Sequence, residues 1–144
     1  MNINTRFTIA VHIITLIAFD GSATSERMAA SVGNHPVAVR QVISQLKKAG
    51  LVETQNGIAR ARLKRPQEEI SLYDIYKAVE KDETLFNVHP DPNQECPVGR
   101  NILSALDAPL MHAQAAMENA LKEYSLKDIT AYIVQENSER RRSL

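Results

Sequence analysis

Residues 34–53, NHPVAVRQVISQLKKAGLVE, decide the fold of this chain, because they combine a turn, a helix and the first step into a strand. Pro36 suits the first helical position, where its missing N–H costs nothing, and Asn34 or His35 can cap the helix. Gly50 can end it in the left-handed conformation. Apolar residues recur every three or four positions along one side, which predicts an amphipathic helix. The apolar side comprises Val39, Val42 or Ile43, Leu46 and Ala49, and the opposite side comprises Val37, Arg40, Gln41, Ser44, Gln45, Lys47 and Lys48.

The polar side of this helix is suited to a DNA major groove, because outward Arg, Gln and Ser side chains can hydrogen-bond to base edges. The alternative is that these residues merely form a solvated surface, which is the commoner case for an isolated amphipathic helix. The segments before and after the helix therefore decide between the two interpretations.

Two predicted helices precede this stretch. Residues 5–19 form a broadly apolar helix that Asp20-Gly21 ends, and residues 25–32 form a short helix that Gly33 ends. His12 lies in the apolar run, and we expect a hydrogen-bonded, partly covered side chain rather than a metal ligand, since no Cys or carboxylate stands nearby. The helix at 25–32 and the helix that begins at Pro36 are joined by a tight turn that contains Gly33, and the second of them is polar on its outer side. This arrangement predicts a helix-turn-helix.

Residues 51–66, LVETQNGIARARLKRP, follow as a predicted β-hairpin. Leu51–Thr54 and Ile58–Leu63 alternate like strands, and Asn56-Gly57 between them is a strong hairpin signal. Arg60 and Arg62 fall on one face of the second strand, where they suit phosphate contact or insertion into a narrow minor groove. The alternative is a hairpin whose charges are only solvated. Helix-turn-helix, strand, turn and basic strand together predict a winged helix.

The winged helix is followed by a capped helix and a loop. Ser71 and Asp74 resemble a capping box for a helix that ends near residue 80, and residues 82–97 break regularity. Near the end of the chain, Ser125 is expected to cap a last helix. Its Ile129, Tyr132 and Ile133 are expected to pack back onto the body, and residues 139–144 are expected to fray.

Between these elements, apolar residues recur at helical spacing from Val98 to Tyr124. Pro109 is expected to kink or divide this helix. A helix that long in a chain this small has apolar surface without an intrachain partner, so we expect a second copy of the chain to cover it. The predicted organisation is a DNA-binding domain at 1–66, a connecting helix and loop at 67–97, and dimerisation helices at 98–144.

The charges of this 144-residue chain sum to zero but are unevenly placed. Residues 1–65 hold nine Lys or Arg and three Asp or Glu, a balance of +6, whereas the remainder hold eight and fourteen, a balance of −6. This asymmetry predicts that only the first half meets a polyanion. One cysteine excludes an intrachain disulfide, and the apolar run at 9–19 is too short for a membrane span. We therefore expect a soluble cytoplasmic protein.

Four motifs occur in one order along nearly the whole chain. They are Ala10-Val11-His12-Ile13, Asn34-x4-Val39-Arg40-x-Val42-Ile43-x2-Leu46-x2-Ala49-Gly50-Leu51-Val52, Ile70-Ser71-Leu72-x-Asp74-Ile75-Tyr76-x-Ala78-Val79-Glu80 and Cys96-Pro97-Val98-Gly99. Together they resemble the Rrf-two family of bacterial winged helix-turn-helix transcription regulators. The resemblance implies a mainly α fold with a small β-wing and a long C-terminal dimerisation helix. It also implies a homodimer that places one recognition helix and one wing on each half of an inverted repeat.

The chain departs from the family pattern at two places. Residues 56–62, NGIARAR, stand where many members have a Gly-Gly pair and an aromatic, which leaves the operator sequence open and makes the wing more basic. Members that bind an iron–sulfur cluster have three cysteines before the long helix, and this chain has Cys96 alone. We therefore predict no cluster and no other cofactor. The predicted DNA-contact residues are Ser25, Asn34, His35, Val37, Arg40, Gln41, Ser44, Arg60 and Arg62.

The function predicted from the sequence is a sequence-specific DNA-binding regulator, expected to be a repressor. A winged-helix module that binds protein with the same surface is the alternative. An enzyme is not expected, because His89 is the nearest base to Cys96 and lies in a Pro-rich loop that does not fix their distance. Cys96 is a candidate redox sensor, since a thiolate is favoured at a helix start, or else an inert cap residue. If it is inert, a small molecule bound near residues 89–99 is the expected effector.

Overall fold

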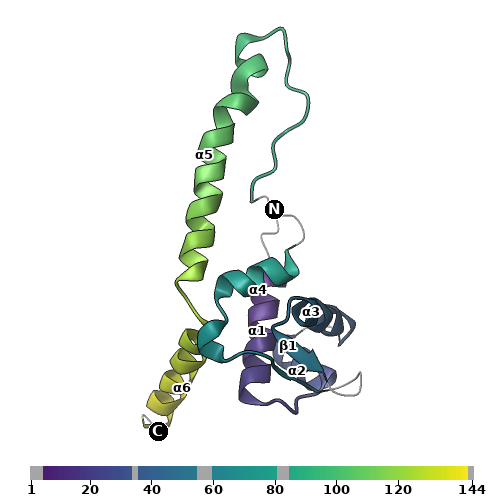
Figure 1. The fold of residues 1–144 in the computed structure, drawn as a ribbon, viewed down its shortest axis with the longest axis vertical. Helices are drawn as coiled ribbons and strands as arrows, with labels where there is room; N and C mark the ends of the chain where they lie inside the picture. Colours follow the sequence, from purple (N-terminus) through teal and green to yellow (C-terminus); the bar gives the residue numbers. More distant parts are fainter. Residues whose placement is uncertain (1–4, 34–35, 55–59, 81–84, 143–144) are drawn as a thin grey trace.

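The computed structural model describes residues 5–33, 36–54, 60–80 and 85–142. A compact body is formed by four helices and a two-stranded antiparallel sheet, and a long helix projects from it (Figure 1). The mainly α fold with a small β-wing is confirmed. In chain order the elements are α1 (Thr5–Phe19), α2 (Ser25–Val32), α3 (Pro36–Lys48), β1 (Val52–Thr54), β2 (Ala61–Leu63), the 3₁₀ turn η1 (Gln67–Glu69), α4 (Leu72–Val79), α5 (Pro97–Lys122) and α6 (Leu126–Arg142).

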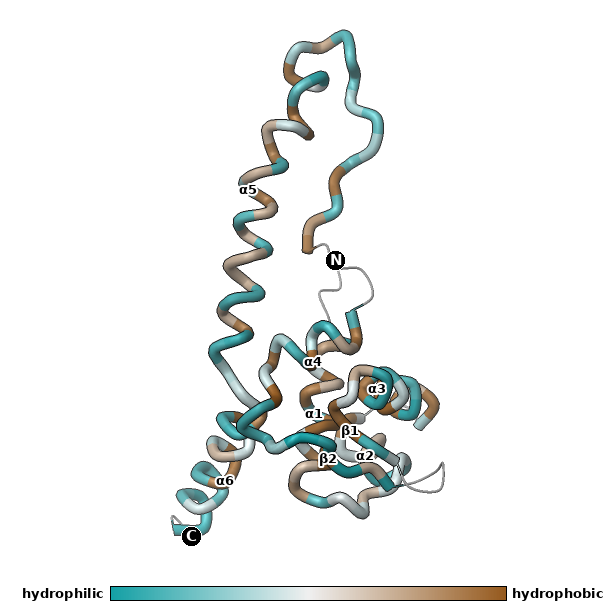
Figure 2. The backbone as a smooth tube through the Cα atoms, in the orientation of Figure 1, coloured by the Kyte–Doolittle hydropathy of each residue, from teal (hydrophilic) through white to brown (hydrophobic). Residues whose placement is uncertain are grey.

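Helix α1 is the centre of the body and packs against α2, α3, α4, α6 and β2. Ala10, Ile13 and Ile14 are fully buried, and the stripe continues through Ile17. Burial of one such Ile side chain stabilises the fold by roughly 1.5–3 kcal/mol. The broad apolar surface predicted for residues 5–19 is therefore explained by neighbours on several sides. Figure 2 shows the same segment as predominantly apolar.

The helix-turn-helix consists of α2 and α3, and each helix is followed by the glycine that the sequence predicts. The Thr24 side chain accepts a hydrogen bond from the Arg27 amide at the start of α2, and Gly33 ends this helix with a φ of 78°. Gly50, with a φ of 77°, follows α3. A left-handed residue at a helix end is favourable for glycine, which has no Cβ to clash.

The buried side of α3 differs slightly from the prediction. Val39, Val42 and Leu46 are buried, Ile43 is half-buried, and Ala49 is exposed. Ala49 lies past the last residue of α3, so the helical spacing that placed it on the apolar side does not apply there.

The wing is a short antiparallel pair in which Val52 faces Leu63, Glu53 faces Arg62 and Thr54 faces Ala61. Val52 and Ala61 are buried against the body, whereas Arg62 points to solvent. The two strands are shorter than predicted. The predicted Asn56-Gly57 turn and Ile58 lie outside the described residues.

Helix α5 contains 26 residues and continues through Pro109, which does not divide it. None of its residues is buried. The segment at 85–96 runs beside it and turns at its far end (Figure 1), and the Leu85 amide donates to Gln114 Oε1 at 3.1 Å. A Cβ added at Gly99 would lie 2.4 Å from the Asn93 carbonyl oxygen, so this turn requires glycine. No helix among the described residues has both the length and the apolar character to cross a membrane.

The starts of α4 and α6 are joined to each other. Ser71 and Asp74 form the predicted capping box of α4, and Ser125 and Asp128 exchange the equivalent hydrogen bonds at the start of α6. Ser71 and Ser125 form an isolated antiparallel bridge. In it, the Leu72 amide donates to the Tyr124 carbonyl at 2.9 Å, and the Leu126 amide donates to the Ile70 carbonyl at 2.8 Å.

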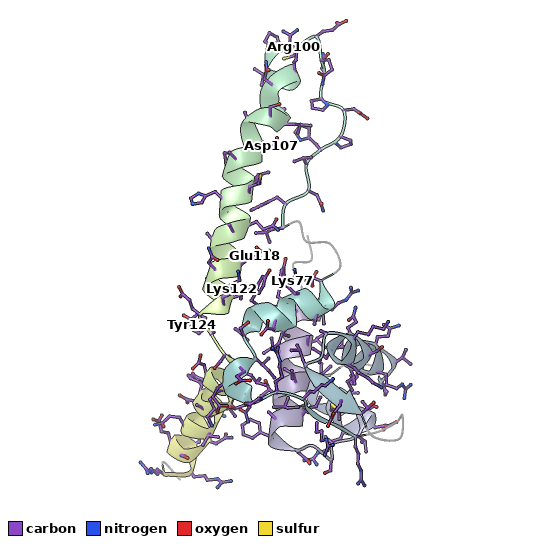
Figure 3. All side chains as sticks on the ribbon, in the orientation of Figure 1. Lys77, Arg100, Asp107, Glu118, Lys122 and Tyr124 are labelled. Atoms are coloured by element: carbon purple, nitrogen blue, oxygen red, sulfur yellow. The ribbon has the colours of Figure 1, made fainter. Side chains whose placement is uncertain are left out.

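A second contact stiffens the junction at the base of α5. The Lys122 ammonium lies 4.6 Å from the centre of the Tyr73 ring, and the Lys77 ammonium lies 5.9 Å from it. Figure 3 shows both lysines at this base, with Arg100 near the opposite end of α5. Each such cation–π contact stabilises by about 0.5–1 kcal/mol when exposed.

The buried residues of helix α6 include two that were not predicted, and one predicted residue is exposed. Leu126 and Thr130 are buried, Ile129 and Ile133 are half-buried, and Tyr132 is 67% exposed. The prediction that Tyr132 packs back is therefore wrong within this chain. The predicted frayed tail is instead helical as far as Arg142, and residues 143–144 lie outside the described residues.

Candidate nucleic-acid interface

The exposed side of α3 carries four of the predicted DNA-contact residues. Val37 is 58% exposed, and Arg40, Gln41 and Ser44 are also exposed, because the opposite side of the helix is buried in the core. Asn34 and His35 lie outside the described residues. A helix that presents Arg, Gln and Ser to solvent offers hydrogen-bond donors and acceptors of the kinds that pair with base edges.

The end of α3 is tied to the wing by a side-chain hydrogen bond. Lys47 Nζ donates to Thr54 Oγ1 at 3.0 Å, which brings the polar side of α3 and strand β1 into one surface. The sequence interpretation placed Lys47 on the outward side but assigned a DNA role to neither residue. Helical periodicity ends at Gly50, so no pattern relates a residue of α3 to one of β1.

The wing contributes two exposed arginines, and one of them already has a partner. Arg60 is exposed, and Arg62 Nε lies 2.5 Å from Glu53 Oε1 on the paired strand. Both side chains of this ion pair are largely solvated, so its contribution to stability is within about 1 kcal/mol. An ion pair this weak leaves the Arg62 guanidinium accessible to other anions.

Ser25 is a predicted DNA-contact residue that the fold covers. It is 5% exposed in the first turn of α2, so its hydroxyl faces the body. The sequence does not reveal this burial, because a serine at a helix start can be covered or solvated and tertiary packing decides which. Thr24, Glu26 and Arg27 are exposed at this helix start, and Arg27 Nη1 lies 2.6 Å from Asp20 Oδ2. Hydrogen bonds from Ser22, with Arg27 nearby, lower the pKa of Asp20.

His12 is a structural residue. Its Nε2 lies 3.0 Å from Ser31 Oγ, which joins α1 to α2. The predicted hydrogen bond is confirmed, although the side chain is exposed rather than partly covered.

Cys96 is exposed at the far end of α5, where it is the N-cap residue. Its side chain makes no capping hydrogen bond, yet the amides of Gly99 and Val98 favour the thiolate and lower the pKa of the Cys96 thiol. The position is remote from the surface formed by α3 and the wing (Figure 1). Within one chain, α5 and the segment at 85–96 connect this thiol to the body.

The family model named Rrf2, described as an iron-dependent transcriptional regulator, matches residues 3–132. This chain belongs to the Rrf2 family. It is therefore a DNA-binding transcription regulator of a bacterial family, as the Rrf-two resemblance predicted. A relative of this Rrf2 protein is YwnA of Bacillus subtilis (strain 168), whose name describes a candidate HTH-type transcriptional regulator. The two are 46% identical over 131 residues, which cover 91% of this chain and 98% of YwnA.

Solved structures agree with the fold of this Rrf2 protein. The crystal structure of a candidate DNA-binding protein is 42% identical, covers 87% of this chain and 98% of its own, and has a TM-score of 0.73. The structure of CymR, the global cysteine regulator of B. subtilis, has a TM-score of 0.65 at 19% identity, and the match covers 92% of this chain and 98% of CymR. At that identity CymR supports the fold alone.

The family description mentions iron, so the side chains of this Rrf2 chain can be examined as possible ligands of an iron–sulfur cluster. The chain contains one cysteine, whereas protein-bound iron–sulfur clusters are held mainly by several thiolates. Within the ranges that the structure describes, no three His, Cys, Asp or Glu side chains gather at a spacing that could hold a metal ion. These residues do not fit an iron–sulfur cluster.

The lowered pKa of the Cys96 thiol predicts that this cysteine is alkylated at a lower pH in the folded protein than in the unfolded chain. Because the folded-state pKa lies below the ordinary value, the thiolate fraction at a given pH is higher in the folded protein than in the unfolded chain. We expect the rate of alkylation by iodoacetamide, followed by mass spectrometry, to reach half its maximum at a lower pH in the native protein than in guanidinium. Equal midpoints would contradict the stabilisation by the Gly99 and Val98 amides. The readout is unambiguous because the chain has a single cysteine.

Proposed function

We propose that this Rrf2 protein is a cytoplasmic, sequence-specific repressor that binds an inverted-repeat operator as a homodimer. Helix α3 would enter the major groove, and the wing would contact the adjacent minor groove or backbone. Residues 1–66 would bind DNA, residues 67–97 would connect, and residues 98–144 would dimerise. The single observation that carries this proposal is the continuous polar surface that Lys47 and Thr54 form between α3 and the wing.

The major-groove assignment rests on the shape and chemistry of α3. The major groove is about 12 Å wide and admits one helix. Arg40 and Gln41 are exposed in the N-terminal half of α3, which is the part that reaches base edges in helix-turn-helix docking. Asn34 and His35 precede this half and remain predicted contacts. Ser25 is omitted from the proposed set because it is buried.

The dimer is supported by the apolar surface of α5, which the chain itself does not bury. This helix is about 39 Å long at 1.5 Å per residue. Val98 is 69% exposed, no residue of the helix is buried, and the hydropathy colouring of Figure 2 shows apolar residues recurring along the whole helix. A second copy would remove this surface from water and would place two α3 helices on one duplex.

The competing function is a winged-helix module that binds protein with the same surface. The +6 balance of residues 1–65 favours DNA, because phosphate neutralisation requires cations. Retention on DNA that falls steeply with salt would support the proposal, whereas salt-independent capture of a protein partner would support the alternative.

The effector is proposed to act at the far end of α5. Oxidation of the Cys96 thiol by peroxide to sulfenic acid, with release of water, would add a polar atom at the N-terminus of this helix. We expect mild peroxide to weaken DNA binding by the wild type and to leave Cys96→Ser unchanged, as measured by fluorescence anisotropy. If the two proteins respond equally, Cys96 is structural, and a small molecule near residues 89–99 becomes the proposed effector.

Substitutions on α3 and on the wing should have different effects on DNA binding. Arg40→Ala is expected to cost about 1–3 kcal/mol on the selected operator and to relax preference at one base position, because Arg can fork onto guanine. Arg60→Ala and Arg62→Ala are expected to weaken binding to all DNA sequences alike. Each should also reduce by about one the salt slope, which is the slope of the logarithm of the binding constant against the logarithm of the salt concentration. Selection from random DNA, followed by titrations at several salt concentrations, measures both. Lys127→Ala, which removes an exposed cation on α6, is the control. A uniform loss for Arg40→Ala would mean that α3 does not read bases.

The face of α5 that meets a second copy can be tested with neighbouring alanines. Ala116 lies 18 residues, or five helical turns, from Val98 and therefore shares its face, whereas Ala115 is turned about 100° away. We expect light scattering at micromolar concentration to give twice the chain mass of 16.1 kDa for the wild type and for Ala115→Glu. Ala116→Glu should give the monomer mass. A monomeric wild type would contradict the dimer itself.

A further inference from the structure

We propose that Arg65 is a positioning residue for the wing, which holds Arg60 and Arg62 in place for DNA without contacting DNA itself. This inference rests on the proposed function, since it requires the wing to bind the duplex. It concerns residues 64–71, which connect strand β2 to helix α4 and are named the strap.

The strap is anchored at both ends by backbone hydrogen bonds. At its start, the Lys64 amide donates to the Leu51 carbonyl at 3.0 Å, which closes the base of the wing. At its end, Ile70 is fully buried, and its carbonyl accepts from the Leu126 amide at the start of α6. Only a few residues separate the two anchors, so side-chain contacts along the strap determine how firmly the wing is held.

Arg65 supplies the first of these contacts. Its Nη2 lies 3.3 Å from Asp74 Oδ2, and the same carboxylate oxygen accepts the Ser71 amide at 3.0 Å. The Asp74 amide in turn donates to Ser71 Oγ at 3.0 Å. One carboxylate therefore both caps α4 and binds the residue that follows the wing by two positions.

The side chain of Arg65 is less exposed than that of Arg62, and its inner part lies against the body. It is 40% exposed, compared with 62% for Arg62. Its Nε is a buried donor without a hydrogen-bond partner among the described residues, so protein atoms cover the inner part of the guanidinium. A phosphate ligand would instead present its donors outward, as Arg62 does. Arg65 is thus placed to fix the chain, and the wing arginines are placed to meet DNA.

A second side-chain contact connects the strap to α6. Thr130 is buried, and its Oγ1 donates to Gln67 Oε1 at 2.6 Å. Helix α6 begins four residues after α5 ends, and the Ser71–Ser125 bridge holds that connection against α4. The orientation of the wing is therefore set relative to α5, and hence to a second copy packed on α5. Loss of the Arg65 contact would leave the wing mobile, and DNA binding would then have to order it.

The test is a double-mutant cycle on DNA affinity. Arg65→Met keeps the length of the side chain and removes its charge and donors. In the wild-type background we expect about fivefold weaker operator binding, within the range of coupled neighbours, with no change in the salt slope. In the Arg60→Ala/Arg62→Ala background, Arg65→Met should have no further effect, because no wing contacts remain to be positioned. Thermal unfolding of each variant gives the folded fraction for which the affinities are corrected.

Two further variants make the outcome decisive. Asp74→Asn retains the oxygen that caps α4 and removes the charge that binds Arg65, so it should reproduce Arg65→Met and not add to it. Lys127→Met, an equal loss of charge on α6, should leave operator affinity unchanged apart from a small electrostatic effect. Equal losses for Arg65→Met in both backgrounds, or a salt slope reduced by about one, would overturn this inference alone. A wild type without salt-dependent DNA binding would overturn the proposed function and this inference with it.

Discussion

The antiparallel bridge between Ser71 and Ser125 is the constraint on which the rest of this structure depends. It joins the first turns of α4 and α6, and the two hydrogen bonds of the bridge use amides that a helix start would otherwise leave unpaired. Because α4 belongs to the body and α6 follows α5, the bridge attaches the long helix to the winged helix. Without it, the remaining side-chain contacts of the 26-residue α5 would include the cation–π contact of Lys122 with Tyr73 on α4 and the hydrogen bond from the Leu85 amide to Gln114.

This attachment explains how one chain can combine a DNA surface with a remote helix end. The polar side of α3 and the wing share a surface through Lys47 and Thr54, whereas Cys96 lies at the opposite end of α5 (Figure 1). The rigid path between them consists of α5, the bridge and the strap. Within one chain, a chemical change at Cys96 could reach DNA binding by moving α5 or the segment at 85–96, because both connect Cys96 to the body.

Sequence patterns predicted the local structure of this protein well, because each prediction depended on residues within one or two turns. The bounds of α1 and α2 follow from apolar spacing and from Asp20 and Gly33 as stops. The capping box of α4 follows from Ser71 and Asp74, which are three residues apart. The polar side of α3 was also predicted, since burial of Val39, Val42 and Leu46 leaves Arg40 and Gln41 outside. The DNA roles of these residues remain predictions.

The sequence by itself thus determined which segments are helices, where they begin, and which family of regulators the chain resembles. Only the tertiary structure decided which polar residues outside α3 are covered and which polar residues of different elements pair with each other. Ser25 is buried, Arg62 is paired with Glu53, and Arg65 is bound to Asp74, although nothing in their spacing distinguishes them from exposed neighbours. Each contact joins residues from different elements, and periodicity describes only the faces within one element. The packing of α4, α6 and the wing around α1 brings such residues together, because burial of the apolar core fixes the elements relative to one another.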